Sequence, residues 1–314
     1  MKKAVSLCCV ILLSAALLSL TGCPKPEGTP PVPQQNNNGG GTKPASPGTT
    51  TAEGLKLPLQ PSAQDTLTTE LPQLAAVLPA SVFGKTAQDA AAAIPAADLA
   101  AQIDEYIKKL EEIDDLDTAS RDASALTLVA LAAGISKEDS KYKKSAAGII
   151  SAAGEIAKAK TVDDAKKLYE KLKTASSAES PAVTAGTKAA ELTPIMKAVP
   201  NLSSTITRTT NTEKKLKKVV EKSPEKVYGP LAALAAISQG AVANSKDTTP
   251  VDEAKWKAEC EQFCDAALKA NAAAHGFTDG KVSYDDYSKA LKNMTDTCDK
   301  CHEVFHKAAA GKNE

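Results

Sequence analysis

The chain has 314 residues, with 38 basic and 38 acidic side chains and a formal net charge of zero at pH 7. Nucleic acids attract proteins through an excess of basic residues, so this balance argues against a nucleic-acid partner. Aromatic residues form only 4% of the chain. Most of the protein core is therefore predicted to consist of alanine and leucine.

Residues 1–22 carry a predicted export signal. Lys2 and Lys3 precede an apolar stretch from Ala4 to Leu20, and small residues lead to Cys23. This arrangement resembles a bacterial lipoprotein signal. The resemblance implies cleavage before Cys23, lipid on its thiol, and anchorage to a membrane facing the periplasm or the cell surface. A short membrane anchor or an ordinary signal is the alternative, although the stretch is shorter than the ~20 residues of a spanning helix.

Residues 23–62 are predicted to be a disordered tether. They are rich in Pro, Gly, Asn, Gln and Thr, which cannot bury enough apolar surface to offset chain entropy. Beyond Cys23, the remaining cysteines all lie near the end of the chain, at Cys260, Cys264, Cys298 and Cys301. Clustered cysteines in an exported protein indicate disulfides, a metal or a thioether-linked cofactor.

After the tether, apolar residues recur at helical spacing, so the sequence predicts an all-α protein. The Ser-, Pro- and Gly-containing stretch 176–186 divides it into a helical unit at residues 63–180 and a four-helix bundle at 187–310. Start signals are expected at Thr161, Thr193 and Ser223. The predicted helices are Ala96–Leu116, Thr118–Gly134, Lys141–Lys160, Val162–Ala175, Pro194–Glu221 with a kink at Pro200, Glu225–Asn244, Val251–His275 and Ser283–Ala309.

The last predicted helix contains the motif C-x-x-C-H. Cys298 and Cys301 are separated by two residues, and His302 follows directly. This is the spacing at which two thiols form thioethers to a c-type haem while the histidine ligates the iron. The motif predicts one covalent haem c, with His302 as an axial ligand.

The apolar periodicity of this helix turns both motif cysteines toward the bundle interior. Tyr284, Tyr287, Leu291, Met294, Cys298, Cys301 and Phe305 follow one another at steps of three and four. In the preceding predicted helix, Trp256 and Cys260 lie on an apolar face with the same spacing. We therefore predict that Trp256, Cys260 and Phe305 contact the cofactor.

The same cysteines support a second hypothesis. If the last two helices form a hairpin, Cys260 and Cys264 face the C-x-x-C segment. Two disulfides, or a zinc ion bound by four thiolates, would then link the hairpin. Under this hypothesis the protein is a non-enzymatic interaction lipoprotein.

The sequence C-x-x-C-H-x-x-F, from Cys298 to Phe305, resembles the end of the cytochrome c′ family, with a looser match over residues 188–307. The resemblance implies an up-down-up-down four-helix bundle in the periplasm, with one haem and His302 as its proximal ligand. It also implies electron transfer or binding of a diatomic gas. Expected partners are a redox protein or such a gas, with a second copy of the chain as a further candidate. His306 departs from the Arg or Lys that the family carries there.

An antiparallel bundle brings the start of its first helix over the other haem face. This places Leu192, Ile195, Met196 and Val199 there, and Met196 is the candidate distal ligand. Methionine ligation would give an electron carrier, whereas apolar exclusion would leave the iron open to small gases. Catalysis would need a polar acid or base on this side, for which only Lys197 is available, so we do not expect an enzyme.

Overall fold

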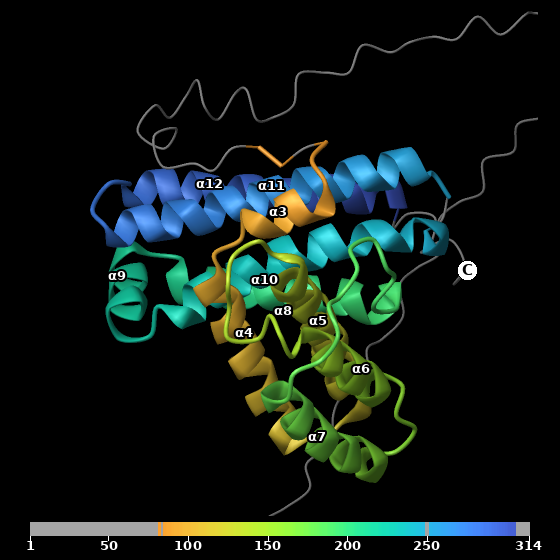
Figure 1. The fold of residues 1–314 in the computed structure, drawn as a ribbon. Helices are drawn as coiled ribbons and strands as arrows, with labels where there is room; N and C mark the ends of the chain where they lie inside the picture. Colours follow the sequence, from red (N-terminus) through yellow and green to blue (C-terminus); the bar gives the residue numbers. More distant parts are fainter. Residues whose placement is uncertain (1–80, 83, 249–250, 306–314) are drawn as a thin grey trace, which may run out of the picture. The chain divides into compact units, whose positions relative to one another are not determined.

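The computed structural model describes residues 81–82, 84–248 and 251–305, and every regular element within these ranges is a helix (Figure 1). This confirms the all-α prediction. Among the described helices, none is long and apolar enough to cross a membrane. The predicted export signal, tether and lipid-attachment residue Cys23, together with His306, lie outside the described residues.

The structure gives the helix bounds directly, and most agree with the predicted segments to within a few residues. A short helix before residue 96 was not expected from the sequence. In chain order the elements are α3 (Ala87–Ala92), α4 (Ala96–Lys109), η1 (Leu110–Glu112), α5 (Leu116–Ile135), α6 (Ala146–Ala157), α7 (Val162–Ser177), α8 (Leu192–Thr210), α9 (Glu213–Lys222), α10 (Glu225–Ala241), η2 (Val242–Asp247), α11 (Glu253–Thr278) and α12 (Tyr284–Phe305).

Helix starts show which local signals operate. The Thr161 hydroxyl accepts a hydrogen bond from the Asp164 amide at 3.1 Å, which confirms the predicted cap of α7. The expected Thr193 cap is wrong, because α8 begins at Leu192 after Glu191, whose side chain makes no capping bond. The Ser223 cap is also wrong: α10 begins at Glu225 as predicted, but Pro224 occupies the cap position and supplies no side-chain bond.

The predicted single helix Pro194–Glu221 is two helices. α8 continues through Pro200 and ends at Thr210. A new start signal follows, because the Thr212 hydroxyl accepts a hydrogen bond from the Lys215 amide and begins α9. The capping threonine therefore divides this segment, and the proline does not.

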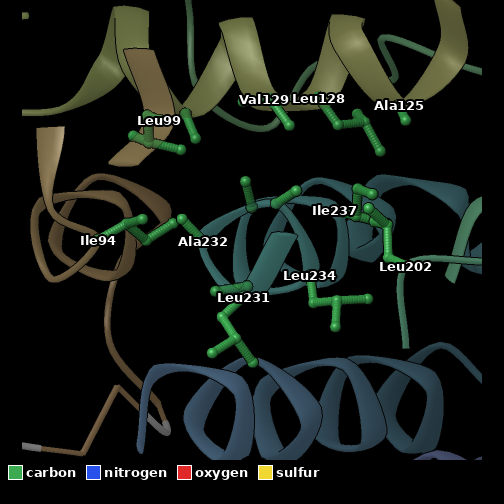
Figure 2. Packing of buried hydrophobic residues seen from close by; sticks show 14 of the residues in the cluster. Ile94, Leu99, Ala125, Leu128, Val129, Leu202, Leu231, Ala232, Leu234 and Ile237 are labelled. Atoms are coloured by element: carbon green, nitrogen blue, oxygen red, sulfur yellow. The ribbon is translucent and has the colours of Figure 1, made fainter. Parts of the chain in front are cut away.

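Helix α10 is the central element of the core. Its residues from Val227 to Ala241 are all buried, as expected for a helix that is apolar on every side. It packs against α4 and α5 on one side and against α8 and α11 on the others. Figure 2 shows Leu231 and Leu234 pointing from α10 toward the blue helices, with Leu128 of α5 on the opposite side. Helices from both sides of the predicted 176–186 boundary thus share one core, and the division into two units stays a prediction.

The last helices are antiparallel neighbours. α11 and α12 form a hairpin whose turn contains Gly280 at φ 71°, a backbone conformation that favours glycine. At the start of α12, the Tyr287 hydroxyl donates to the Thr210 hydroxyl at the end of α8, at 3.0 Å. At the other end of α12, Phe305 shares an apolar cluster with Leu192 at the start of α8. α12 therefore runs antiparallel to both α8 and α11.

Two glycines provide a matched test of helix packing. A Cβ atom at Gly134 of α5 would lie 2.7 Å from the Ala146 Cβ and 2.3 Å from the Val183 side chain, whereas one at Gly154 of α6 would meet nothing within 4 Å. We expect Gly134→Ala to destabilise the fold by about 1–3 kcal/mol through overpacking. Gly154→Ala should stabilise it by about 0.5–1 kcal/mol, because alanine is the better helix former. Urea unfolding followed by circular dichroism measures both changes, and equal effects of the two variants would contradict the packing of α5 against α6.

Candidate functional site

The C-x-x-C-H turn of α12 lies against a small apolar pocket formed by four helices. Cys298, Cys301 and His302 line the pocket from α12. The remaining lining comes from α8 (Met196, Val199), α10 (Ile237, Ser238, Ala241) and α11 (Trp256, Glu259, Cys260, Phe263). The structure thus brings together residues about 100 positions apart, from Met196 to Cys298. α8, α10 and α11 each contribute side chains from the helix face that lies toward α12.

Most of the sequence-predicted site residues meet here. Trp256 and Phe305 are both buried and pack edge to face, with ring centroids 5.2 Å apart. The Trp256 indole donates a hydrogen bond to the Ala241 carbonyl at 2.8 Å, which fixes the ring at the end of α10. Met196 packs against this cluster from α8. Of the other residues expected on the distal side, Val199 lines the pocket, whereas Ile195 belongs to the main core.

The four cysteines do not form one group. Cys260, Cys298 and Cys301 line the same pocket, and the pKa of Cys260 is raised first by burial and then by the neighbouring Cys301 thiol. Cys264, one helical turn further along α11, lines a different cavity beside Val82. All four are free thiols. The expected opposition of two cysteine pairs is therefore not the arrangement in the structure.

Burial keeps the pocket thiols protonated. Desolvation raises the pKa of Cys298 to about 11 and that of Cys301 to about 12, with nearby carboxylates adding to the effect. Burial also raises the pKa of Cys260 well above its usual range. Reactive cysteines in redox enzymes have depressed pKa values, so these thiols lack the property of a catalytic thiolate. A neutral, buried thiol suits a structural or cofactor-attachment role.

This protonation state predicts slow alkylation of the cofactor-free protein. With a pKa of about 11 for Cys298, its thiolate fraction at about pH 8.5 is roughly a hundredfold below that of a free cysteine. We expect iodoacetamide to label the folded chain about a hundredfold more slowly than the urea-unfolded chain. The rate should rise about tenfold per pH unit up to the raised pKa, because only the thiolate reacts. Mass spectrometry of peptides at timed intervals measures the rate, and labelling at the unfolded rate would contradict the burial of Cys298 and Cys301.

One ionisable side chain of the pocket was not predicted from the sequence. Glu259 lines the pocket from α11, and burial raises the pKa of its carboxyl, although Lys255 and Lys300 act in the opposite direction. No sequence signal singled it out, because α11 carries several acidic residues. Lys197, the only acid or base expected near the distal side, instead pairs with Asp117 of α5. Lys197 does not line the pocket.

The pocket residues have the chemistry that a c-type haem requires, but the pocket is too small to hold one. Two thiols, an imidazole and a thioether line one apolar space, which are the groups that attach and ligate such a haem. The open volume is only about 40 Å³, enough for a few water molecules and far less than a porphyrin. Trp256 and Phe305 fill the space beside it. A haem would therefore require these two side chains, or the end of α12, to move outward.

Comparison of the chain with protein-family models, with curated proteins and with solved structures finds no match. Within the described ranges, no group of three or more His, Cys, Asp and Glu side chains is placed to hold a metal ion.

Proposed function

We propose that the protein is a monohaem c-type cytochrome, exported as a membrane-anchored lipoprotein, that transfers electrons or binds a diatomic gas at its haem iron. Cys298 and Cys301 would hold the haem by thioethers, and His302 would be its axial ligand. The observation that carries this proposal is the convergence of these three residues on one apolar pocket between four helices. Bound haem would supply the redox-active or gas-binding iron. The surrounding residues would exclude water from it.

The resemblance to the cytochrome c′ family is supported by the arrangement of α8, α10, α11 and α12. Hydrogen bonds join the end of α10 to the start of α11 (Ala241 to Trp256) and the start of α10 to the end of α11 (Tyr228 to Thr278), so these two helices are antiparallel. With α12 antiparallel to α8 and α11, the four helices alternate in direction as an up-down-up-down bundle requires, and the motif lies on the last of them. Met196 lines the pocket from α8, across from the motif helix. It is the candidate distal ligand, with Val199 as its apolar neighbour. Its ligation would favour the electron-carrier role.

The end of α12 is held mainly by a small apolar cluster. Ala241, Trp256, Cys260 and Phe305 form this cluster apart from the main core, with Cys301 packed against it. Small clusters can separate at less cost than a continuous core, because less apolar surface is exposed. Opening here would give the pocket room for a haem while the α10 core stays packed.

The direct test is maturation of the full chain in a host that attaches c-type haem, followed by purification in detergent. We expect a Soret band, an intact mass raised by one haem, and retention of the pigment in acidified acetone. A colourless protein, or a pigment that the solvent extracts, would overturn the proposal. Spectra of the reduced protein with and without carbon monoxide separate the two roles, because a gas binder has an open iron position.

Met196 has its own spectroscopic test. If its thioether binds the iron, Met196→Ala removes the sixth ligand, and the spectrum changes from low spin toward high spin with new carbon monoxide binding. Val199→Ala is the matched control, because it opens the same wall of the pocket without removing a ligand. Identical spectra of wild-type and Met196→Ala protein would exclude ligation by this residue.

One observation favours a second function. Cys260 and Cys301 line the same pocket on neighbouring helices, so a single disulfide could link α11 to α12 in a helical interaction protein without haem. Intact mass distinguishes the two proposals, because a disulfide removes two hydrogens whereas haem attachment adds a porphyrin. The same purified protein answers both questions.

A further inference from the structure

A larger cavity lies on the side of α11 away from the C-x-x-C-H turn. Its volume is about 290 Å³, close to the lower limit for small-molecule sites. Cys264, Glu261 and Lys257 line it from successive turns of α11, and Gln239 lines it from α10. Further walls come from Val82 and residues 85–90, from Leu131 of α5, and from residues 186–187 and 242–243. None of its lining residues belongs to the proposed haem pocket.

One residue in the cavity wall carries a hydrogen-bonding group without a partner. Gln239 is 9% exposed, and among the described residues its carbonyl oxygen has no hydrogen-bond partner. Buried polar groups are nearly always paired, so an unpaired one in the wall of a cavity calls for a partner. This oxygen is itself buried, so a ligand in the cavity reaches it only if the terminal torsion of the side chain, which is soft, turns it toward the cavity. A ligand that donates a hydrogen bond would satisfy it.

The charges around the cavity favour an anion. Lys85 and Lys257 face a single carboxylate in the lining, Glu261. Glu261 already accepts a hydrogen bond from the Gly84 amide at 3.2 Å, and it lies 3.7 Å from the Lys257 ammonium. The lining therefore has a net positive charge. Val82, Leu131 and Cys264 give the wall an apolar part that suits a hydrocarbon body, and Thr86 and Thr187 add hydroxyl groups.

We propose that this cavity binds a small organic anion that carries a hydrogen-bond donor, such as a hydroxylated carboxylate. Its carboxylate would lie toward Lys85 and Lys257, its apolar body against Cys264 and Leu131, and its hydroxyl would donate to the Gln239 carbonyl. Burial raises the pKa of the Cys264 thiol, so this cysteine contacts the ligand as a neutral apolar group. Binding here is independent of haem.

The probe is 3-hydroxybenzoate, titrated into the full chain in detergent by isothermal calorimetry. Two analogues isolate the two recognition features: 3-methoxybenzoate lacks the donor, and 3-hydroxybenzyl alcohol lacks the charge. We expect each analogue to bind at least about fivefold more weakly, since each loses one polar interaction. Added salt should weaken binding of the benzoates and leave the alcohol unchanged. Failure of 3-hydroxybenzoate to bind, or equal binding of all three compounds, would overturn the proposal.

Variants locate the site. Gln239→Met keeps the side-chain volume and removes the unpaired carbonyl, so the free protein should keep or raise its melting temperature while binding falls at least about fivefold. Lys257→Ala should weaken binding, and the exposed Lys255→Ala, outside the cavity, should not. Ala243→Leu fills the cavity from its rim and should block binding even if a Gln239 variant folds poorly. Unchanged affinity in Lys257→Ala and Ala243→Leu would place the ligand elsewhere and overturn the proposal.

Discussion

Replacing Cys298 and Cys301 together by serine should abolish covalent haem attachment. Each thioether requires a cysteine sulfur, and serine cannot replace it. In the same maturation host, we expect the double variant to lose the Soret band after extraction with acidified acetone and to show the unmodified polypeptide mass. The single variants should retain one linkage at most. This is the largest effect that the proposed function predicts, because the product changes from fully haem-bound to haem-free.

Cys260→Ser is the matched control for that experiment. Cys260 lines the same pocket as the motif cysteines and is more deeply buried than they are, but it is not part of the C-x-x-C-H spacing. We expect this variant to keep its covalent haem. If Cys260→Ser lost the pigment and the double serine variant kept it, attachment through Cys298 and Cys301 would be wrong. If all variants were colourless and wild type lost two hydrogens, a disulfide-linked hairpin would explain the cysteines.

Asp265→Ala should produce the largest loss of stability outside the apolar core. Asp265 and Lys269 form an ion pair at 3.0 Å on α11, with side chains only 3% and 6% exposed. The Asp265 carboxylate also accepts a hydrogen bond from the Val82 amide at 3.0 Å, which holds the segment before α3 against α11. Removing the carboxylate leaves a buried ammonium without its ion pair. We expect a loss of about 3–5 kcal/mol in the free energy of unfolding.

Two further variants test whether burial of the ion pair causes this loss of stability. Asp265→Ala combined with Lys269→Met removes both charges, so it should recover most of the lost stability. Asp296→Ala breaks the exposed pair with Lys292, whose side chains are 48% and 73% exposed, and should change stability by less than about 0.5 kcal/mol. Urea unfolding followed by circular dichroism measures all three. Equal losses for the Asp265 and Asp296 variants would contradict the burial of the α11 pair.

Much of the fold could be predicted because it depends on local periodicity. The apolar spacing of 3.6 residues indicated the helices from α4 to α12, and Thr161 correctly marked the start of α7. The errors arose where two local signals compete. One helix was expected from Pro194 to Glu221, but α8 continues through Pro200 and ends at Thr210, and the Thr212 cap begins a second helix. Sequence pattern alone does not rank such signals.

The candidate site could be predicted only in part. Motif spacing identified Cys298, Cys301 and His302, and helix direction placed Met196 near them. The separation of Cys264 from Cys260 was not foreseen, because both lie on one broad face of α11. α12 covers one part of that face, and the segment beginning at Val82 covers another. Which neighbour covers which part depends on packing between distant segments.

The pairing of His275 with Asp98 could also not be predicted from the sequence. The imidazole of His275 lies 2.8 Å from the buried Asp98 carboxylate and stacks on Tyr228, with ring centroids 3.8 Å apart. From the sequence, His275 was expected to lie at the end of its helix, but α11 continues to Thr278 and the glycine of the turn is Gly280. A residue 177 positions away is its partner.

The sequence by itself determined the helical class and the C-x-x-C-H turn, because both depend on residues within one or two helical turns of each other. Only the tertiary structure decided that Glu259 shares a pocket with the motif, that the open volume of this pocket is only about 40 Å³, and that Cys264 faces a separate cavity. The physical reason is that covalent spacing and helical period set local geometry. Contacts between distant helices result from the summed packing of many side chains, which no single position encodes.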